Sequence, residues 1–372
     1  MVEILFILII SIIIMLLMFP KGNINNKQGK YLLIGGITVI AICAAMIVPK
    51  ANFDLARHYK DYYIIRHSNM NLWEYVFNSS RITDANYRYT YFYNLINYAV
   101  SKYMVKESIP FISMVVCYGV WGYILLDYKK QNRLPNFYVA LSILVLNCLM
   151  PILYVYSNVR NEIAVAVMAL GLYLRIYKKI NIFVFAGLAL LAGTMHPIVL
   201  IVIPFVFLAN IRPGKKGIIL VAVIPIALSW GSEKFIKSSN QFLRYIGFKF
   251  YNYTYVTEYS QGSFFFYTAI IFTAFILLLS VLRRNIRTRN VADYRFLNFL
   301  SWYCIFTLAN FQSYQIVMRL PYILGVLSPI IVNVAFKIEN YKGYKKLVIV
   351  FGMILLILIS FYALYVNYAW MR

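Results

Sequence analysis

The sequence predicts an all-α membrane protein of about a dozen transmembrane helices. Of its 372 residues, 62% are hydrophobic and only 13% are charged, a composition typical of chains whose solvent is mostly lipid. Long uncharged runs recur from one end to the other, and several approach the roughly 20 apolar residues that a helix needs to cross the hydrocarbon core. The basic residues lie mainly in short links between these runs, as they do in cytoplasmic loops.

Twelve apolar runs are expected to cross the membrane as helices, because a helix satisfies its own backbone hydrogen bonds in lipid. They are residues 2–19, 31–49, 108–126, 136–155, 160–176, 181–195, 197–210, 217–231, 264–282, 296–311, 318–336 and 347–366. The first run has no basic segment before it and no small-residue cleavage site, which favours a retained span over a removed signal peptide. Residues 1–372 are therefore expected to form a single integral membrane domain.

The net charge of +24 would suggest a nucleic-acid partner in a soluble chain. Here the cations lie in links such as "RPGKKG" and "KIENYKGYKK", so the bilayer is the expected partner and no nucleic acid is expected. Placing these links inside puts both termini outside, together with residues 50–107 and residues 232–263. The first of these outer loops is rich in aromatic residues and is expected to form amphipathic helices at the membrane surface.

The four cysteines predict neither a metal centre nor a disulfide framework. Cys43, Cys117, Cys148 and Cys304 all fall in predicted spans and show no CxxC spacing. They are expected to act as small apolar packing residues. No cofactor is expected.

The densest group of chemically capable residues is "FDLARHYKDYYIIR", just after the second predicted span. On a helix, Asp54 and His58 are i,i+4 neighbours, as are Arg57 and Asp61. A carboxylate can orient or activate an imidazole as a general base, and an arginine can hold a phosphate oxygen. The alternative is a set of surface ion pairs, each stabilising by less than about 1 kcal/mol, that anchors a loop helix at the headgroups.

Four further residues at the outer side are candidates for binding an anion. Arg160 opens the fifth span, although it could instead snorkel to the interface. Pro197 favours an extended or broken backbone at His196, which could point into a cavity or lie in an ordinary turn between two spans. Arg319 is the only charge between residues 296 and 336, and its planar fork suits diphosphate oxygens. Arg88 lies at the centre of the basic, aromatic stretch "NYRYTYFYN".

Together these features resemble the EpsG-like, Wzy-type polymerases of bacterial surface polysaccharides. The resemblance runs from about residue 50 to residue 325 and rests on four features. They are the outer-loop Asp, His, Tyr and Asp, the Arg that heads a small-residue helix, the "MHP" before an apolar run, and a late "R-x-x-x-Y".

The resemblance implies an inner-membrane glycosyltransferase that works on its periplasmic side. Such enzymes join undecaprenyl-diphosphate-linked repeat units into O-antigen, capsule or exopolysaccharide, and a polysaccharide chain-length regulator is a possible partner. The resemblance also implies a fold similar to GT-C-type glycosyltransferases, without a metal.

The residues suit this chemistry. Asp54, His58 or Asp61 could be the base for an acceptor hydroxyl, and Arg57, Arg88, Arg160, His196 and Arg319 could bind the lipid diphosphate. Tyr62, Tyr87 and Tyr91 could stack on sugars, unless they form an interfacial aromatic belt.

Two other functions remain open. A flippase of lipid-linked oligosaccharide would have a similar number of spans, but its charges should lie at span centres, and here those are almost free of charge. A membrane acyltransferase that modifies sugars would be expected to place a histidine near the cytoplasmic openings, whereas the three histidines here lie towards the outer side.

Overall fold

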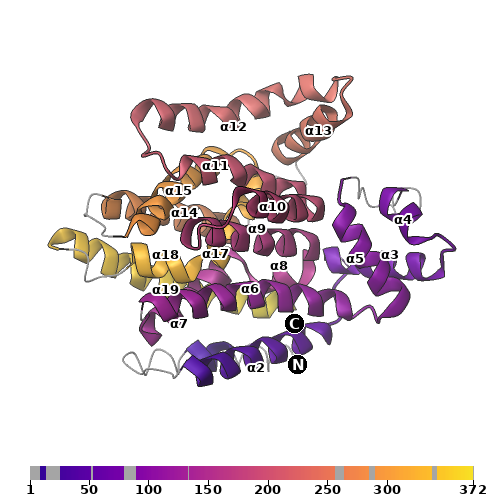
Figure 1. Ribbon diagram of the computed structural model, residues 1–372, viewed down its shortest axis with the longest axis horizontal. Helices are drawn as coiled ribbons and strands as arrows, with labels where there is room; N and C mark the ends of the chain where they lie inside the picture. Colours follow the sequence, from indigo (N-terminus) through magenta and orange to yellow (C-terminus); the bar gives the residue numbers. More distant parts are fainter. Residues whose placement is uncertain are drawn as a thin grey trace. The chain divides into compact units, whose positions relative to one another are not determined.

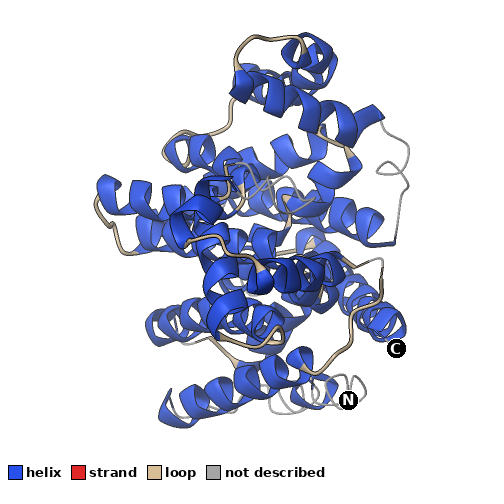
Figure 2. Ribbon diagram, turned by 90° about the vertical axis from the view of Figure 1, so that its right-hand side faces the viewer, coloured by secondary structure: helices blue, strands red, loops and turns tan. Residues whose placement is uncertain are grey.

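A computed structural model describes residues 9–13, 26–51, 53–78, 89–132, 134–255, 264–284, 290–336 and 342–371. Within these ranges the regular elements are all helices (Figure 2), which confirms the predicted all-α class. The named helices are α2 (Asn26–Ala45), α3 (Asp54–His67), α4 (Leu72–Asn78), α5 (Tyr91–Tyr103), α6 (Ser108–Asn132), α7 (Asn136–Leu149), α8 (Ile152–Ser157), α9 (Val159–Tyr177), α10 (Ile182–Met195), η2 (Pro197–Val202), α11 (Ile203–Leu208), α12 (Lys215–Ile236), α13 (Gln241–Tyr255), α14 (Phe264–Arg284), α15 (Val291–Ala309), α16 (Tyr314–Arg319), α17 (Tyr322–Val326), α18 (Ser328–Ala335) and α19 (Tyr344–Met371).

Four described helices are long and apolar enough to cross a membrane: Ser108–Asn132, Lys215–Ile236, Phe264–Arg283 and Tyr344–Val366. A fifth span results if the bent pair Tyr314–Val326 and Ser328–Ala335, with its 76° angle, counts as one. Shorter apolar helices occupy most of the other predicted runs. The predicted count of twelve is therefore not confirmed.

Prolines lie at or beside several breaks between helices in the predicted spans. Pro151 separates α7 from α8, so the run predicted over 136–155 is two helices. Pro197 lies between α10 and η2, which were predicted as separate runs, and the run predicted over 318–336 bends between α17 and α18, just before Pro329. Proline lacks a backbone N–H and disfavours helical geometry in the residue before it, so Pro151 and Pro197 interrupt a helix, whereas Pro329 lies in the first turn of α18, where proline is tolerated.

The chain divides into two compact units, and each is described by itself. Unit 1 comprises residues 1–201, 325–330 and 360–372. In it α6 packs against α2, α8 and α9, and α10 packs against α9 and α5. The loop predicted over residues 50–107 contains α3, α4 and α5, which lie beyond the ends of α2 and α6 (Figure 1).

Buried hydrogen bonds fasten later segments of the chain into unit 1. The Trp121 indole N–H donates to Ser328 Oγ at 3.0 Å, and the Ser328 hydroxyl donates to the Ser142 carbonyl at 2.8 Å. The Cys148 thiol donates to Ser360 Oγ at 2.9 Å. All four cysteines are buried and none forms a disulfide, in agreement with the packing role expected for them.

Unit 2 comprises residues 202–324 and 331–359, and the middle of its helix α15 is buried. Asn298 donates to the Ala209 carbonyl at 3.2 Å, and Trp302 donates to the Ile211 carbonyl at 2.9 Å, so α15 holds the end of α11 and the turn after it. The loop predicted over residues 232–263 contains the end of α12 and all of α13. These two helices form a closely packed hairpin.

Gly247 sets how closely α12 and α13 approach, and replacing it tests the hairpin. A Cβ at this position would lie 2.7 Å from the Ile236 nitrogen and 2.8 Å from the Ser232 carbonyl oxygen. Because backbone atoms cannot move aside cheaply, Gly247→Ala should destabilise unit 2 by about 1–3 kcal/mol. Thermal unfolding of the purified protein in detergent measures this. Gly231→Ala is the control, because there a Cβ makes only an ordinary contact with the Phe235 ring at 3.6 Å. Equal melting temperatures for the two variants would contradict the packing argument.

Candidate functional site

Helix α3 begins at the first residue of the candidate cluster. Phe53 is extended, and Asp54 follows in the first helical turn, where a carboxylate suits the positive end of the helix dipole. Arg66 and His67 lie in the last turn, at the negative end. The buried face of the helix carries Leu55, His58, Asp61, Tyr62 and Ile65. The helix thus places an acid and a histidine of the cluster in the interior.

Helix α5 packs beside α3 and runs in the same direction. His58 lies opposite Tyr93 near one end of the pair, and Arg66 lies opposite Ser101 near the other. Thr90, Asn94, Asn97 and Ser101 form a buried polar face along α5. Asn94 and Asn97 are bonded to α4, through the Val76 carbonyl at 3.1 Å and the Tyr75 hydroxyl at 3.2 Å. The three helices are therefore joined through polar groups as well as through apolar contact.

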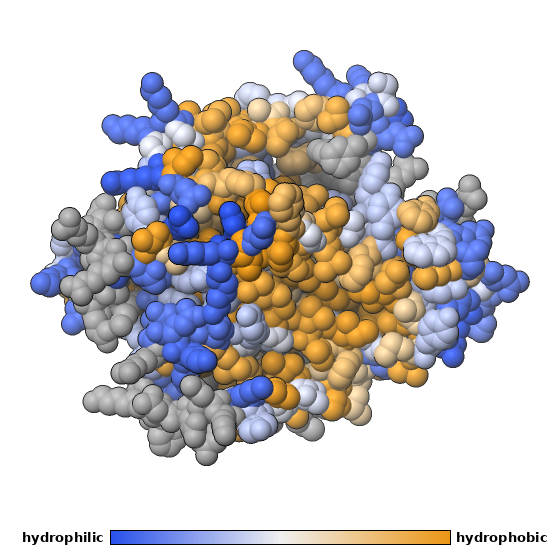
Figure 3. Space-filling model, viewed as in Figure 1, coloured by the Kyte–Doolittle hydropathy of each residue, from blue (hydrophilic) through white to orange (hydrophobic). Residues whose placement is uncertain are grey.

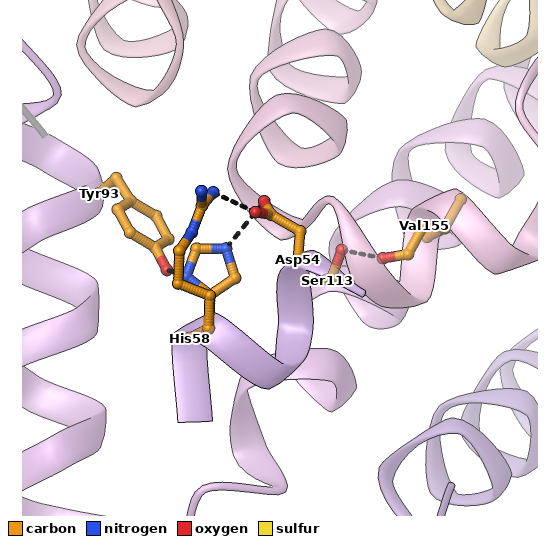
Figure 4. A network of polar contacts seen from close by, with 6 residues as sticks. Asp54, His58, Tyr93, Ser113 and Val155 are labelled. Carbon is orange, nitrogen blue, oxygen red and sulfur yellow. Dashed lines mark hydrogen bonds and ion pairs between the residues drawn. The ribbon is translucent and has the colours of Figure 1, made fainter. Parts of the chain in front are cut away.

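An ion-pair contact and a hydrogen bond link three side chains from α3 to α5 (Figure 4). His58 Nε2 lies 3.3 Å from Asp54 Oδ2, and His58 Nδ1 lies 2.7 Å from the Tyr93 hydroxyl. A carboxylate can only accept, so Nε2 carries the proton that points to Asp54. In a neutral imidazole Nδ1 is then the acceptor, and the Tyr93 hydroxyl donates to it. Asp54 and Tyr93 together fix the tautomer of His58.

Two arginines flank this chain. Arg57, about half exposed, forms an ion pair with Asp54. The guanidinium of Arg160, in the first turn of α9, lies 5.4 Å from the centre of the Tyr93 ring, within the range of a cation–π interaction. Arg160 therefore links the helices of the loop to α9, and the site carries positive charge on both sides of the histidine.

The electrostatics of the site favour a charged carboxylate and a neutral phenol. Burial raises the pKa of Asp54, but the contact with His58 and the charges of Arg160 and Arg57 lower it further, so the net pKa lies far below its ordinary value. Burial holds the pKa of Tyr93 well above its ordinary value. Asp54 is thus an anion at any physiological pH, and Tyr93 keeps its proton.

The burial of these groups decides which of them a substrate can reach. His58 is fully buried and Asp61 is 2% exposed, whereas the Asp54 side chain is 25% exposed. Asp54 and Arg57 are therefore the part of the network that faces solvent, and His58 and Tyr93 lie behind them.

Two predictions about this cluster need correction. Arg57 was expected to pair with Asp61 four residues on, but it pairs with Asp54, and its side chain points outward while Asp61 is buried. Tyr62 was expected to stack on sugar, but it is 4% exposed. Its hydroxyl donates to the Met104 carbonyl at 2.8 Å, and Arg66 lies over its ring. Tyr62 is a packing residue because it falls on the inward face of α3.

The other predicted residues are not all brought to this network. Tyr87 and Arg88 lie outside the described residues. Tyr91 is 38% exposed at the start of α5. His196 is half-buried and caps α10 with the extended backbone that Pro197 predicts. Arg319 ends α16 in unit 2.

Tyr93 is the member of the network that the sequence did not single out. It is one of seven tyrosines and phenylalanines between residues 87 and 103, and its neighbours have the same chemistry. One signal was available: Thr90, Asn94, Asn97 and Ser101 recur at helical spacing, which indicates a polar inward face. Tyr93 lies beside that face.

The helical fold and the apolar helices indicate a helical membrane protein, and the acid–histidine–tyrosine network is a polar site in the segment between α2 and α6. The family comparison is more specific: the model of the EpsG family matches residues 33–371. The chain belongs to the EpsG family. Comparison with curated proteins and with solved structures gives no match.

Removing the Tyr93 hydroxyl should weaken the packing of α3 on α5. In Tyr93→Phe the buried Nδ1 of His58 loses its donor, which should cost about 1–3 kcal/mol. Tyr98→Phe is the matched control on the same helix, since the Tyr98 hydroxyl donates at 3.0 Å to the backbone carbonyl of Met70 from a half-buried position. Thermal unfolding in detergent compares them. A Tyr93→Phe protein as stable as Tyr98→Phe would contradict the proposed bond.

The low pKa of Asp54 predicts how stability depends on pH. Because the folded pKa lies below the ordinary value of 3.8, the ionised carboxylate contributes its full stabilisation above that value and loses it as the pH falls towards the folded pKa. The melting temperature of the natural chain should therefore exceed that of Asp54→Asn by a constant amount between pH 5 and 8, and by less below about pH 4. A difference in melting temperature that grows as the pH falls would contradict this prediction.

Proposed function

We propose that the chain is an inner-membrane glycosyltransferase that polymerises undecaprenyl-diphosphate-linked oligosaccharide repeat units on the periplasmic side. The observation that carries the proposal is membership of the EpsG family over residues 33–371, which suggests a polysaccharide polymerase. The distribution of basic links supports the orientation, because it puts residues 50–107 outside. The network of Asp54, His58 and Tyr93 lies within that loop.

The reaction joins two lipid-linked glycans. A hydroxyl oxygen of the acceptor attacks the anomeric carbon of the donor glycan, the bond from that carbon to the diphosphate oxygen breaks, and the hydroxyl proton passes to a base. The lipid diphosphate leaves with the bonding electrons. The protein must therefore supply a proton acceptor for the hydroxyl and positive charge for the departing diphosphate.

Asp54 is the proposed acceptor of the hydroxyl proton, because it is the member of the network that retains exposed surface. His58 orients it through Nε2, and Tyr93 fixes the tautomer that makes this possible. Asp61 is too deeply buried to be the first choice. A carboxylate with a very low pKa is a weak base. One of the interactions that lower the pKa of Asp54 must therefore weaken when substrate binds.

The ion pair between Arg57 and Asp54 is the interaction that substrate can weaken. Arg57 pairs with Asp54 and is about half exposed, and a diphosphate with several negative oxygens would compete with one carboxylate for its guanidinium. Transfer of Arg57 from Asp54 to the departing diphosphate would raise the basicity of Asp54 and stabilise the leaving group. Arg160 is proposed to add positive charge for the departing diphosphate, and Arg319 and His196 remain candidates for binding the lipid diphosphate.

The proposal is tested in cells that lack the native copy, by separating their surface polysaccharide on a gel. Asp54→Asn, His58→Ala and Arg160→Ala should each leave single repeat units on the outer face in place of long chains. His67→Ala is the control, because His67 lies on the exposed face of the same helix. Persistence of long chains at normal protein levels would remove the role assigned to that residue. Loss of exported single repeats would instead indicate a flippase.

A further inference from the structure

Helix α4 has one buried side and one exposed aromatic side. Tyr75 and Val76 are buried against α5. On the opposite side the rings of Trp73 and Phe77 are 63% and 64% exposed. A short helix that buries a tyrosine and exposes a tryptophan and a phenylalanine leaves apolar surface that its own fold does not cover.

The exposed rings form a continuous surface. Trp73 and Phe77 lie 6.3 Å apart, centre to centre, with their planes only 21° from parallel. Phe77 in turn lies 5.5 Å from Tyr91, at the start of α5. We call Trp73, Phe77 and Tyr91 the aromatic ledge. The bond from Asn94 to the Val76 carbonyl fixes α4 to α5, one turn of helix beyond Tyr91, so the ledge is held beside the helix that carries Tyr93.

A second exposed apolar patch in the same loop is bordered by different side chains. Tyr103, Met104 and Val105 are 82%, 46% and 62% exposed, directly before the long apolar helix α6. Arg66, Lys102 and Lys106 surround them. Apolar residues bordered by cations at the end of a span are typical of a bilayer interface.

The α4 part of the aromatic ledge lacks that signature. Between residues 71 and 78 the sequence is "NLWEYVFN", which contains Glu74 and two asparagines and no lysine or arginine. An exposed carboxylate is repelled by anionic headgroups, whereas carboxylates and amides bind sugar hydroxyls. In Figure 3 hydrophilic side chains gather over α3, α4 and α5, while hydrophobic ones cover α6 and α8. These observations favour a carbohydrate over a lipid surface as the occupant of the ledge.

We propose that the aromatic ledge binds the glycan that is being extended. The flat apolar C–H face of a sugar ring fits an aromatic ring, and Trp73, Phe77 and Tyr91 would hold successive sugars while Glu74 binds their hydroxyls. The idea rests on the proposed polymerase function. Beyond that function, we assign a ligand to the ledge, which is a neutral or basic glycan chain. The ledge would keep that chain attached to the protein between additions.

Direct binding tests the ledge without any assumption about catalysis. The full-length protein in lipid nanodiscs is titrated with oligosaccharides cut from the polysaccharide that its host cell makes. The double variant Trp73→Ala with Phe77→Ala should bind them roughly tenfold more weakly, which corresponds to about 1.4 kcal/mol. Tyr103→Ala is the matched control, because it removes an exposed aromatic from the cation-bordered patch, and its affinity should not change. Unchanged affinity in the double variant would overturn the proposal.

Chain length and lipid contact complete the test. In cells, the double variant should produce shorter polysaccharide ladders, unlike the single repeats expected when Asp54 or His58 is replaced, so failure of the ledge and failure of the polymerase function give different results. The fluorescence emission of Trp73 is the difference between the emission of the natural chain and that of Trp73→Phe. In nanodiscs that contain brominated lipid, this emission should resist quenching. Strong quenching of the Trp73 emission would show that the ledge lies in the bilayer and would overturn the proposal.

Discussion

The parallel packing of α3 and α5 is the constraint on which the candidate site depends. Parallel helices place the negative ends of their dipoles side by side, which is unfavourable unless cations lie there. Each helix supplies the cation for the other. Arg66 of α3 donates to the Met104 carbonyl at 3.0 Å, and Lys102 of α5 donates to the Ser68 carbonyl at 2.6 Å. This reciprocal capping satisfies carbonyls that neither helix can satisfy alone.

The same packing brings His58 and Tyr93 together at the other end of the pair. A buried imidazole and a buried phenol are each costly unless hydrogen-bonded, and their bond to one another, with Asp54 beyond it, removes much of that cost. Arg160 extends the arrangement to α9 through the Tyr93 ring. The loop is therefore fixed at one end by capping cations and at the other by the network, so the side chains of the site are held before any substrate arrives.

The sequence predicted much of this region from local rules. Helical spacing placed Asp54 beside His58, charge placement singled out Arg160, and Pro197 predicted the extended backbone at His196. The failures have physical causes. Arg57 and Tyr62 were misjudged because spacing on one helix does not show which face the neighbouring helices cover. Tyr93 was missed because its role comes from a contact across 35 residues of sequence. The long apolar runs were read as whole spans, although Pro151 divides one of them and another bends just before Pro329.

The location of the network suits chemistry on charged groups near a membrane. At the centre of a bilayer, Asp54, Arg57 and Arg160 would each carry a large desolvation cost. In open water their interactions would be screened. The network lies beyond the ends of α2 and α6 (Figure 1), which avoids the desolvation cost. It is packed among helices, which limits the screening by water. Partial burial keeps the electric field of Asp54, Arg57 and Arg160 strong, while the exposed part of Asp54 leaves a point of contact. In the proposed function, the diphosphate of the lipid-linked substrate would bind at these partly exposed charges.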